Sequence, residues 1–253
     1  MSGLGLPSHL GVLAFLFALA AGATACTLRT DEASAGHESA DATEAASLER
    51  YSAIVKAAGG ELNPHGTATI LGLRGARRGG DLHETRTGTV FDDTFVVLTA
   101  DHRVVELSGS THPWFTHSTL SPDVDGDGVR DVAMIRPGLY EVVGRPASAN
   151  IGGSPTYHVL TPKGSDALPA WRDTRHDGSF DAAERLASEA RHDTAGAILF
   201  HLGGLSSVPA IGCQVFPDAD LRRLVDAVGG PQARFNYVLV DANAIAAPEK
   251  DAP

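Results

Sequence analysis

Two residues of this chain are of the right types for nucleophilic catalysis, Cys213 and a histidine twelve positions before it, His201. A cysteine enzyme needs a thiolate, an imidazole that takes the thiol proton, and backbone N–H groups that hold the oxyanion. Gly212 directly precedes the cysteine and would let the backbone approach a substrate closely. The N–H groups around Cys213 and Gln214, just before an expected helix, are candidate oxyanion donors. The segment 198–216 therefore predicts an acyl-transfer site.

The surroundings of the cysteine lead to further expectations. His201 and a nearby helix N-terminus should both lower the pKa of the thiol. We assign Gln214 and the glycine pair Gly203-Gly204 to substrate binding. Three other side chains are candidates to orient the imidazole: His158, His192 and Asp193. Two alternatives remain open, because a free cysteine is often an inert core residue and a histidine at a strand end is often satisfied by backbone groups.

An acidic loop, SPDVDGDGVRDVAM, carries the second group of chemically active residues. Its D-x-D-x-D-G-x-x-D spacing is typical of a calcium loop, in which alternate oxygens wrap a hard cation and the glycine allows the sharp turn. The predicted ligands are Asp123, Asp125, Asp127, Asp131 and the carbonyl of Val129. Met134 stands where an EF-hand has its glutamate. The ion would be structural, because an oxygen-only calcium site does not activate a thiol, and a merely solvated acidic turn is the alternative.

A second acidic stretch, 173–181, repeats part of this pattern with Asp173, Asp177 and Asp181. Arg175 occupies one of the ligand positions, so we do not expect this stretch to bind calcium by itself.

The N-terminus is typical of an export signal. Residues 10–25 are apolar or small throughout, too short for a bilayer span of roughly 20 residues but suited to a signal peptide. We expect 1–25 to be cleaved, which leaves Cys26 either lipidated, as in a lipoprotein, or in an ordinary secreted N-terminus. An acidic, disordered tether should follow over 26–46. Cys213 would then have no disulfide partner in an oxidising compartment, the cell envelope or periplasm.

Length and charge limit the partners. A chain of 253 residues predicts one main domain, here 47–245, with a short disordered tail over 246–253. The formal net charge of −11 disfavours nucleic acid and anionic lipid surfaces, so membrane contact is expected only through a lipid on Cys26.

The elements that must position the site are mostly strands. Periodicity predicts helices over 44–58, 181–192 and 218–228. It predicts strands within 67–75, 89–100, 102–110, 131–144, 156–162, 195–204 and 236–242. The expected fold class is mainly β, a mixed sheet or barrel-like domain with a few short helices.

The motif residues also carry a resemblance. His201 followed by Ala210-Ile211-Gly212-Cys213-Gln214-Val215-Phe216 resembles the catalytic motif of the L,D-transpeptidase (YkuD-like) superfamily, above all a divergent branch found in bacteria and phage. Other segments agree in order and rough spacing, so that the likeness covers about residues 67–228: ILGLRG (70–75), FDDTFVVL (91–98), RPGLYEVVG (136–144), YHVL (157–160) and WRDTRHDGSFD (171–181).

The resemblance implies a function. In that family the cysteine attacks the carbonyl of a peptidoglycan stem-peptide residue and forms a thioester, which water or an amine resolves. By position, Cys213 would be the nucleophile and His201 the base, and catalysis would need no cofactor. Ala210, Ile211 and Gln214 depart from the main family's Ser or Thr, His and Arg, so transferase and hydrolase outcomes both stay open. The rivals are a catalytically silent envelope-binding lipoprotein of the same fold and a calcium-stabilised adhesion module.

Overall fold

The computed structural model describes residues 31–204 and 210–246, and of 31–42 and 246 only the backbone. The expected signal peptide, Cys26 and residues 247–253 of the expected tail lie outside the described part. The chain divides into two units, 1–41 and 42–253, and the second contains every strand and every site residue discussed below. None of the helices in the described residues is long and apolar enough to cross a membrane.

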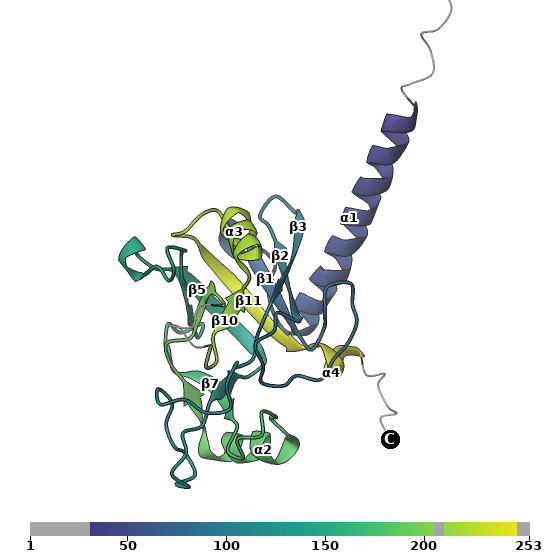
Figure 1. Ribbon diagram of the computed structural model, residues 1–253. Coiled ribbons are helices and arrows are strands. Elements are labelled where there is room, and N and C mark those ends of the chain that lie inside the picture. The colour runs from purple at the N-terminus through teal and green to yellow at the C-terminus, as the bar shows by residue number, and fades with distance from the viewer. Residues whose placement is uncertain (1–30, 205–209, 247–253) are drawn as a thin grey trace, which may run out of the picture. The chain divides into compact units, whose positions relative to one another are not determined.

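The larger of two sheets has eight strands and forms a nearly closed barrel (Figure 1). In sheet order the strands are β10 (Gln214–Phe216), β9 (Leu199–Leu202), β6 (Tyr157–Leu160), β5 (Gly138–Gly144), β11 (Arg234–Asp241), β1 (Thr69–Arg74), β2 (Asp93–Leu98) and β3 (Val104–Gly109). Ser110, directly after β3, exchanges two backbone hydrogen bonds of 2.8 and 3.1 Å with Val215 of β10. This bridge brings the two edges together. The expected mainly β, barrel-like fold class is confirmed.

Aromatic side chains fill the barrel. Phe95, Phe200, Phe216 and Tyr237 are all fully buried and contact one another, with ring centroids 4.6–6.2 Å apart. Side chains alternate across a strand, so the residues between these rings lie on the outer face of the barrel. β1 pairs in parallel with β11 and β9 with β10, while the other neighbours of the large sheet are antiparallel.

A helix covers part of the outer face. The first helix, α1 (Asp31–Ala57), buries Tyr51 and Val55 in a second apolar cluster with Leu71 of β1 and Val96 of β2. The helix begins earlier than the expected residue 44 and extends through most of the segment expected to be disordered. The physical reason lies in its composition, because Ala and Glu are strong helix formers and no proline interrupts residues 31–57.

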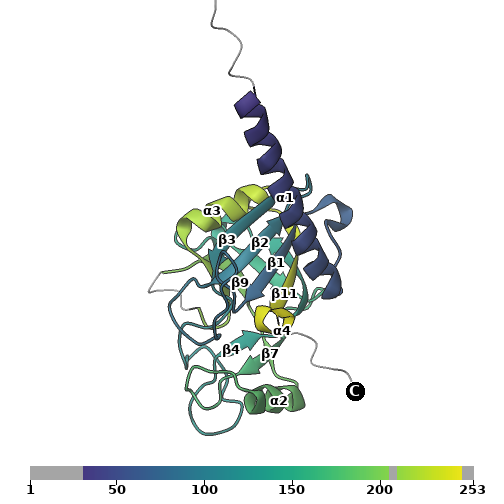
Figure 2. The same cartoon turned by 90° about the vertical axis from the view of Figure 1, so that its right-hand side faces the viewer.

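A small three-stranded sheet and α2 lie together at one end of the barrel, with α3 near the other end (Figures 1 and 2). The small sheet consists of β4 (Ala133–Ile135), β7 (Leu168–Arg172) and β8 (Thr194–Ala195). The remaining elements are α2 (Ala182–Arg191), α3 (Asp218–Ala227), α4 (Ala242–Ala246) and two short 3₁₀ turns, η1 (Pro64–Gly66) and η2 (Ala147–Ala149). Periodicity predicted every strand of the barrel except β10, and missed β7, β8 and α4.

Candidate functional site

Two neighbouring strands bring the candidate nucleophile and base to one face of the barrel. β9 and β10 run parallel with Val215 paired to His201, so Cys213, directly before β10, falls beside Leu199. Their side chains therefore share the face opposite the core aromatics. Both residues line one cavity of about 400 Å³. Its other walls come from Leu120–Pro122, Ala133, Arg172, residues 195–199 and Ile211.

One ring nitrogen of the histidine has a hydrogen-bond partner, and the other has none among the described residues. His201 is 1% exposed, and its Nδ1 lies 2.8 Å from the carbonyl oxygen of Leu202. A carbonyl only accepts hydrogen bonds, so Nδ1 carries the proton and Nε2 presents its lone pair. Nε2 is buried and has no hydrogen-bond partner among the described residues. Burial lowers the pKa of His201, which keeps the imidazole neutral.

The residue that orients this imidazole is not one of those we expected. The Leu202 carbonyl holds Nδ1, and no hydrogen bond links His201 to His158, His192 or Asp193 in the described structure. A backbone carbonyl fixes the tautomer as a carboxylate would, but without a negative charge to stabilise the imidazolium.

The thiol differs from expectation in its electrostatics. Cys213 is 8% exposed, and its Sγ lies 4.0 Å from the carbonyl oxygen of Ala197. Burial raises its pKa to about 11, an effect that the backbone N–H of Leu199 partly offsets. The expected lowering of the thiol pKa is therefore contradicted. The helix α3 begins at Asp218, as expected, but the strand β10 lies between it and the cysteine. Burial thus favours the neutral form of both the thiol and the imidazole.

The backbone conformation directly before the cysteine requires a glycine at position 212. Its φ is +142°, and a Cβ there would lie 2.7 Å from the carbonyl oxygen of Ala133 and 3.2 Å from Cδ1 of Ile198. Only glycine fits such a close approach at this φ without strain. The prediction that this position needs a glycine is consistent with the geometry, although the group it approaches is the β4 backbone.

Gln214 supports the motif from inside the barrel. Its side chain is fully buried, donates through Nε2 to the Gly212 carbonyl at 3.2 Å, and accepts from the Tyr237 hydroxyl at 2.8 Å. It does not line the cavity that contains Cys213. The assignment of this side chain to substrate binding is therefore corrected, since it fixes the position of the Gly212 peptide.

The glycine pair after β9 is also not among the residues that line the cavity. A Cβ on Gly203 would lie 2.8 Å from the Phe91 ring and 2.9 Å from Trp114, whose rings pack edge to face at 5.4 Å. Gly203 is thus a packing glycine, while Gly204 takes the positive φ of a turn, +83°. Residues 205–209 of this loop lie outside the described part.

Arg172 of β7 is the cavity residue that sequence reasoning missed. It is buried, donates from Nη1 to the carbonyl of Asp131 at 2.9 Å, and donates from Nη2 to the carbonyl of Thr194. Burial lowers its pKa. Its Nε has no hydrogen-bond partner among the described residues. No local signal marked it, because β7 was not expected and its role depends on packing against the small sheet.

The two acidic loops flank the paired strands β4 and β7. In the first, carboxylate oxygens of Asp123, Asp125 and Asp127 lie within 4.8 Å of one another, and Asp131 is buried nearby. Val129 donates its N–H to Asp127. In the second, oxygens of Asp173, Asp177 and Glu184 lie equally close. Glu184 occupies position twelve counted from Asp173, a signal that would have been found by extending the expected pattern three residues further.

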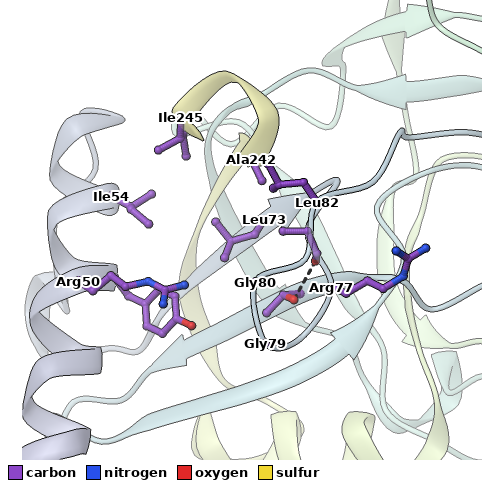
Figure 3. A pocket seen from close by; sticks show the side chains of 12 residues that line it. Arg50, Ile54, Leu73, Arg77, Gly79, Gly80, Leu82, Ala242 and Ile245 are labelled. Atoms are coloured by element: carbon purple, nitrogen blue, oxygen red, sulfur yellow. Dashed lines mark hydrogen bonds between the residues drawn. The ribbon is translucent and has the colours of Figure 1, made fainter. Parts of the chain in front are cut away.

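A second cavity, of about 180 Å³, is lined by residues of α1, the loop after β1 and α4 (Figure 3). Ile54, Leu73 and Ile245 point toward it, and its lining contains no cysteine, histidine or carboxylate. This cavity therefore offers no thiol, imidazole or carboxylate, and the cavity beside Cys213 is the better candidate.

Comparison of this chain with known protein families, with characterised proteins and with solved structures found no match.

Proposed function

We propose that Cys213 and His201 are the nucleophile and base of a cysteine-dependent acyltransferase or peptidase that acts on peptidoglycan stem peptides through a thioester. One observation carries the proposal: His201, whose buried Nε2 has no hydrogen-bond partner among the described residues, lines the same cavity as Cys213. An unpartnered buried nitrogen is costly, and a proton-accepting role explains why it is kept. The choice of peptidoglycan rests on the motif resemblance alone.

The chemistry begins from the neutral pair. As Sγ of Cys213 attacks a substrate carbonyl, the thiol proton moves to Nε2 of His201, and the S–C bond forms. Collapse of the tetrahedral intermediate breaks the C–N bond, and the leaving amine takes the proton from Nε2. The freed Nε2 then accepts a proton from water or from an acceptor amine as that nucleophile attacks the thioester carbonyl. Collapse of the second tetrahedral intermediate breaks the S–C bond, and Nε2 returns the proton to Sγ of Cys213.

The proposed setting is the cell envelope. The apolar segment before Cys26 supports export, with or without a lipid on that cysteine.

A catalytically silent, envelope-binding lipoprotein is the second candidate. The raised thiol pKa and the 8% exposure of Cys213 favour it, because a silent domain has no need of a reactive thiolate. The Nε2 of His201, which has no hydrogen-bond partner among the described residues, favours the enzyme.

The deciding experiment incubates defined muropeptides with the wild-type protein and with Cys213→Ala. Intact-protein mass spectrometry should detect an acyl adduct on the wild type, and product analysis should show cleavage or exchange. The variant should give neither while keeping the wild-type circular dichroism spectrum. Full turnover by Cys213→Ala would refute the cysteine mechanism, and no reaction by the wild type would favour the silent lipoprotein.

A further inference from the structure

The loop before β4 gathers negative charge that its own backbone only partly neutralises. Asp123 accepts N–H groups from Gly126 at 2.7 Å and from Gly128 at 3.0 Å, and Asp127 accepts from Val129 at 2.7 Å. Oxygens of Asp123, Asp125 and Asp127 still lie within 4.8 Å of one another. Three carboxylates this close repel one another, and a divalent cation between them would remove the repulsion.

A buried carboxylate oxygen gives independent support. Asp131 has no solvent exposure, and its Oδ2 accepts the N–H of Val124, a residue of the same loop, at 2.6 Å. Its Oδ1 is buried and accepts no hydrogen bond from the described residues, while the imidazole Nε2 of His176 lies 3.6 Å from it and 3.4 Å from Oδ2 of Asp127. A contact of 3.6 Å is too long for a hydrogen bond, and a buried carboxylate oxygen that accepts none is unfavourable, which indicates that another group satisfies it.

We propose that this loop binds one calcium ion through carboxylates of Asp123, Asp125, Asp127 and Asp131, with the carbonyl of Val129 as a further ligand. Calcium fits better than magnesium, because several protein oxygens from a turn suit its large and flexible coordination shell, whereas magnesium keeps most of its waters. This site does not depend on the proposed function of Cys213.

The second acidic loop is not expected to bind calcium, so the expected stoichiometry is one calcium ion per chain. Nη2 of Arg175 lies 2.5 Å from Oδ2 of Asp181 and 3.5 Å from Oε2 of Glu184. Both oxygens of Asp173 accept backbone N–H groups. The guanidinium of Arg175 thus supplies positive charge where a metal ion would otherwise lie. The buried carboxylate of Asp173 has no unsatisfied oxygen among the described atoms.

The calcium loop is joined to the wall of the Cys213 cavity. Asp131 donates its N–H to the Pro122 carbonyl at 2.8 Å and accepts Nη1 of Arg172 at 2.9 Å through its own carbonyl. Pro122 and Arg172 both line the cavity. An ion that fixes Asp131 would therefore also hold this wall.

The test is calorimetric titration of calcium chloride into chelator-treated protein, with melting curves recorded in parallel. Asp127→Asn changes one exposed ligand of the first loop, and Asp177→Asn is the matched change at the same position of the second loop. The wild type should bind one ion with a dissociation constant of about 10⁻⁴–10⁻³ M, as in extracellular modules. Asp127→Asn should weaken binding by about tenfold or more, and Asp177→Asn should leave it unchanged.

Several results would overturn the proposal. They are an unchanged melting curve with and without calcium, tighter binding of magnesium than of calcium, and loss of binding in Asp177→Asn but not in Asp127→Asn. Asp125→Asn, also on an exposed side chain, replaces Asp127→Asn if that variant loses the folded circular dichroism spectrum in chelator. Repeating the titration on Cys213→Ala, which should bind as the wild type does, separates this site from the proposed enzyme.

Discussion

The alkylation rate of Cys213 tests how burial sets its reactivity. With a pKa of about 11, the thiolate fraction at pH 7 is about 10⁻⁴, whereas a free thiol with a pKa of about 8.5 has a fraction of about 3 × 10⁻². Only the thiolate reacts with iodoacetamide, so the folded protein should react about 300-fold more slowly at pH 7 than a free thiol. The 8% exposure of the residue should slow it further.

The assay follows iodoacetamide labelling by mass spectrometry between pH 6 and 10, for the folded and the urea-unfolded protein. Cys213→Ala retains Cys26 and supplies the background where that residue is present. The folded rate should still be rising at pH 10, while the unfolded rate should level off after about pH 8.5. His201→Gln should leave the folded profile nearly unchanged, because in the resting state burial and not an ion pair with the imidazole determines the pKa.

A fast labelling phase in the wild type near pH 6 that disappears in His201→Gln would refute this reasoning. It would mean that the resting pair is a thiolate and an imidazolium, and that the charges stabilise each other more than burial penalises them.

Two further predictions concern stability. Gly212→Ala should lower the free energy of unfolding by more than about 2 kcal/mol in urea titrations, because its Cβ would meet the Ala133 carbonyl. The control is Gly153→Ala, which also has a positive φ but has nothing within 4 Å of the added Cβ, and it should cost only about 1 kcal/mol. Equal losses in the two variants would contradict the close approach at Gly212. The hydrogen bond to Asp93 raises the pKa of His83 to about 9, above its unfolded value of about 6.5. The resulting stabilisation of at most about 3 kcal/mol is complete below pH 6.5 and is lost as the pH rises through 9. In His83→Gln the urea midpoint should change less with pH over this range, and an unchanged profile would show that another group is responsible.

The sequence predicts the barrel well because its strands are locally encoded. The segments that contain β1, β2 and β11 are β-branched or aromatic runs bounded by turn residues, and both faces of these strands are buried. β10 could not be found in this way, because it has three residues and exists through its pairing with β9 and Ser110. A strand that exists through non-local pairing shows no hydrophobic periodicity in its own sequence.

The candidate site also has features that the local sequence predicts and features that depend on tertiary structure. That Cys213 and His201 share a cavity follows from two adjacent strands, which the spacing suggested. The interior position of Gln214 follows from register, because residues 213 and 214 of one strand point to opposite faces. The thiol pKa depends on how deeply the barrel and the small sheet bury the sulfur, and this tertiary quantity is not present in any local motif.

The raised pKa has a consequence for how such a site could work in an oxidising compartment. Forming the thiolate alone at pH 7 would cost about 5 kcal/mol, since each pKa unit is worth about 1.4 kcal/mol. Oxidation and disulfide exchange also proceed through the thiolate, so the same burial protects a cysteine that has no disulfide partner in the described residues. Transfer of the proton to Nε2 of His201 during attack avoids a free thiolate, at the cost of an imidazolium whose Nδ1 is held only by a carbonyl. The barrier must then be lowered mainly where charge develops on the substrate oxygen. The enzyme hypothesis therefore depends more on oxyanion donors at the bound substrate than on an activated resting thiol.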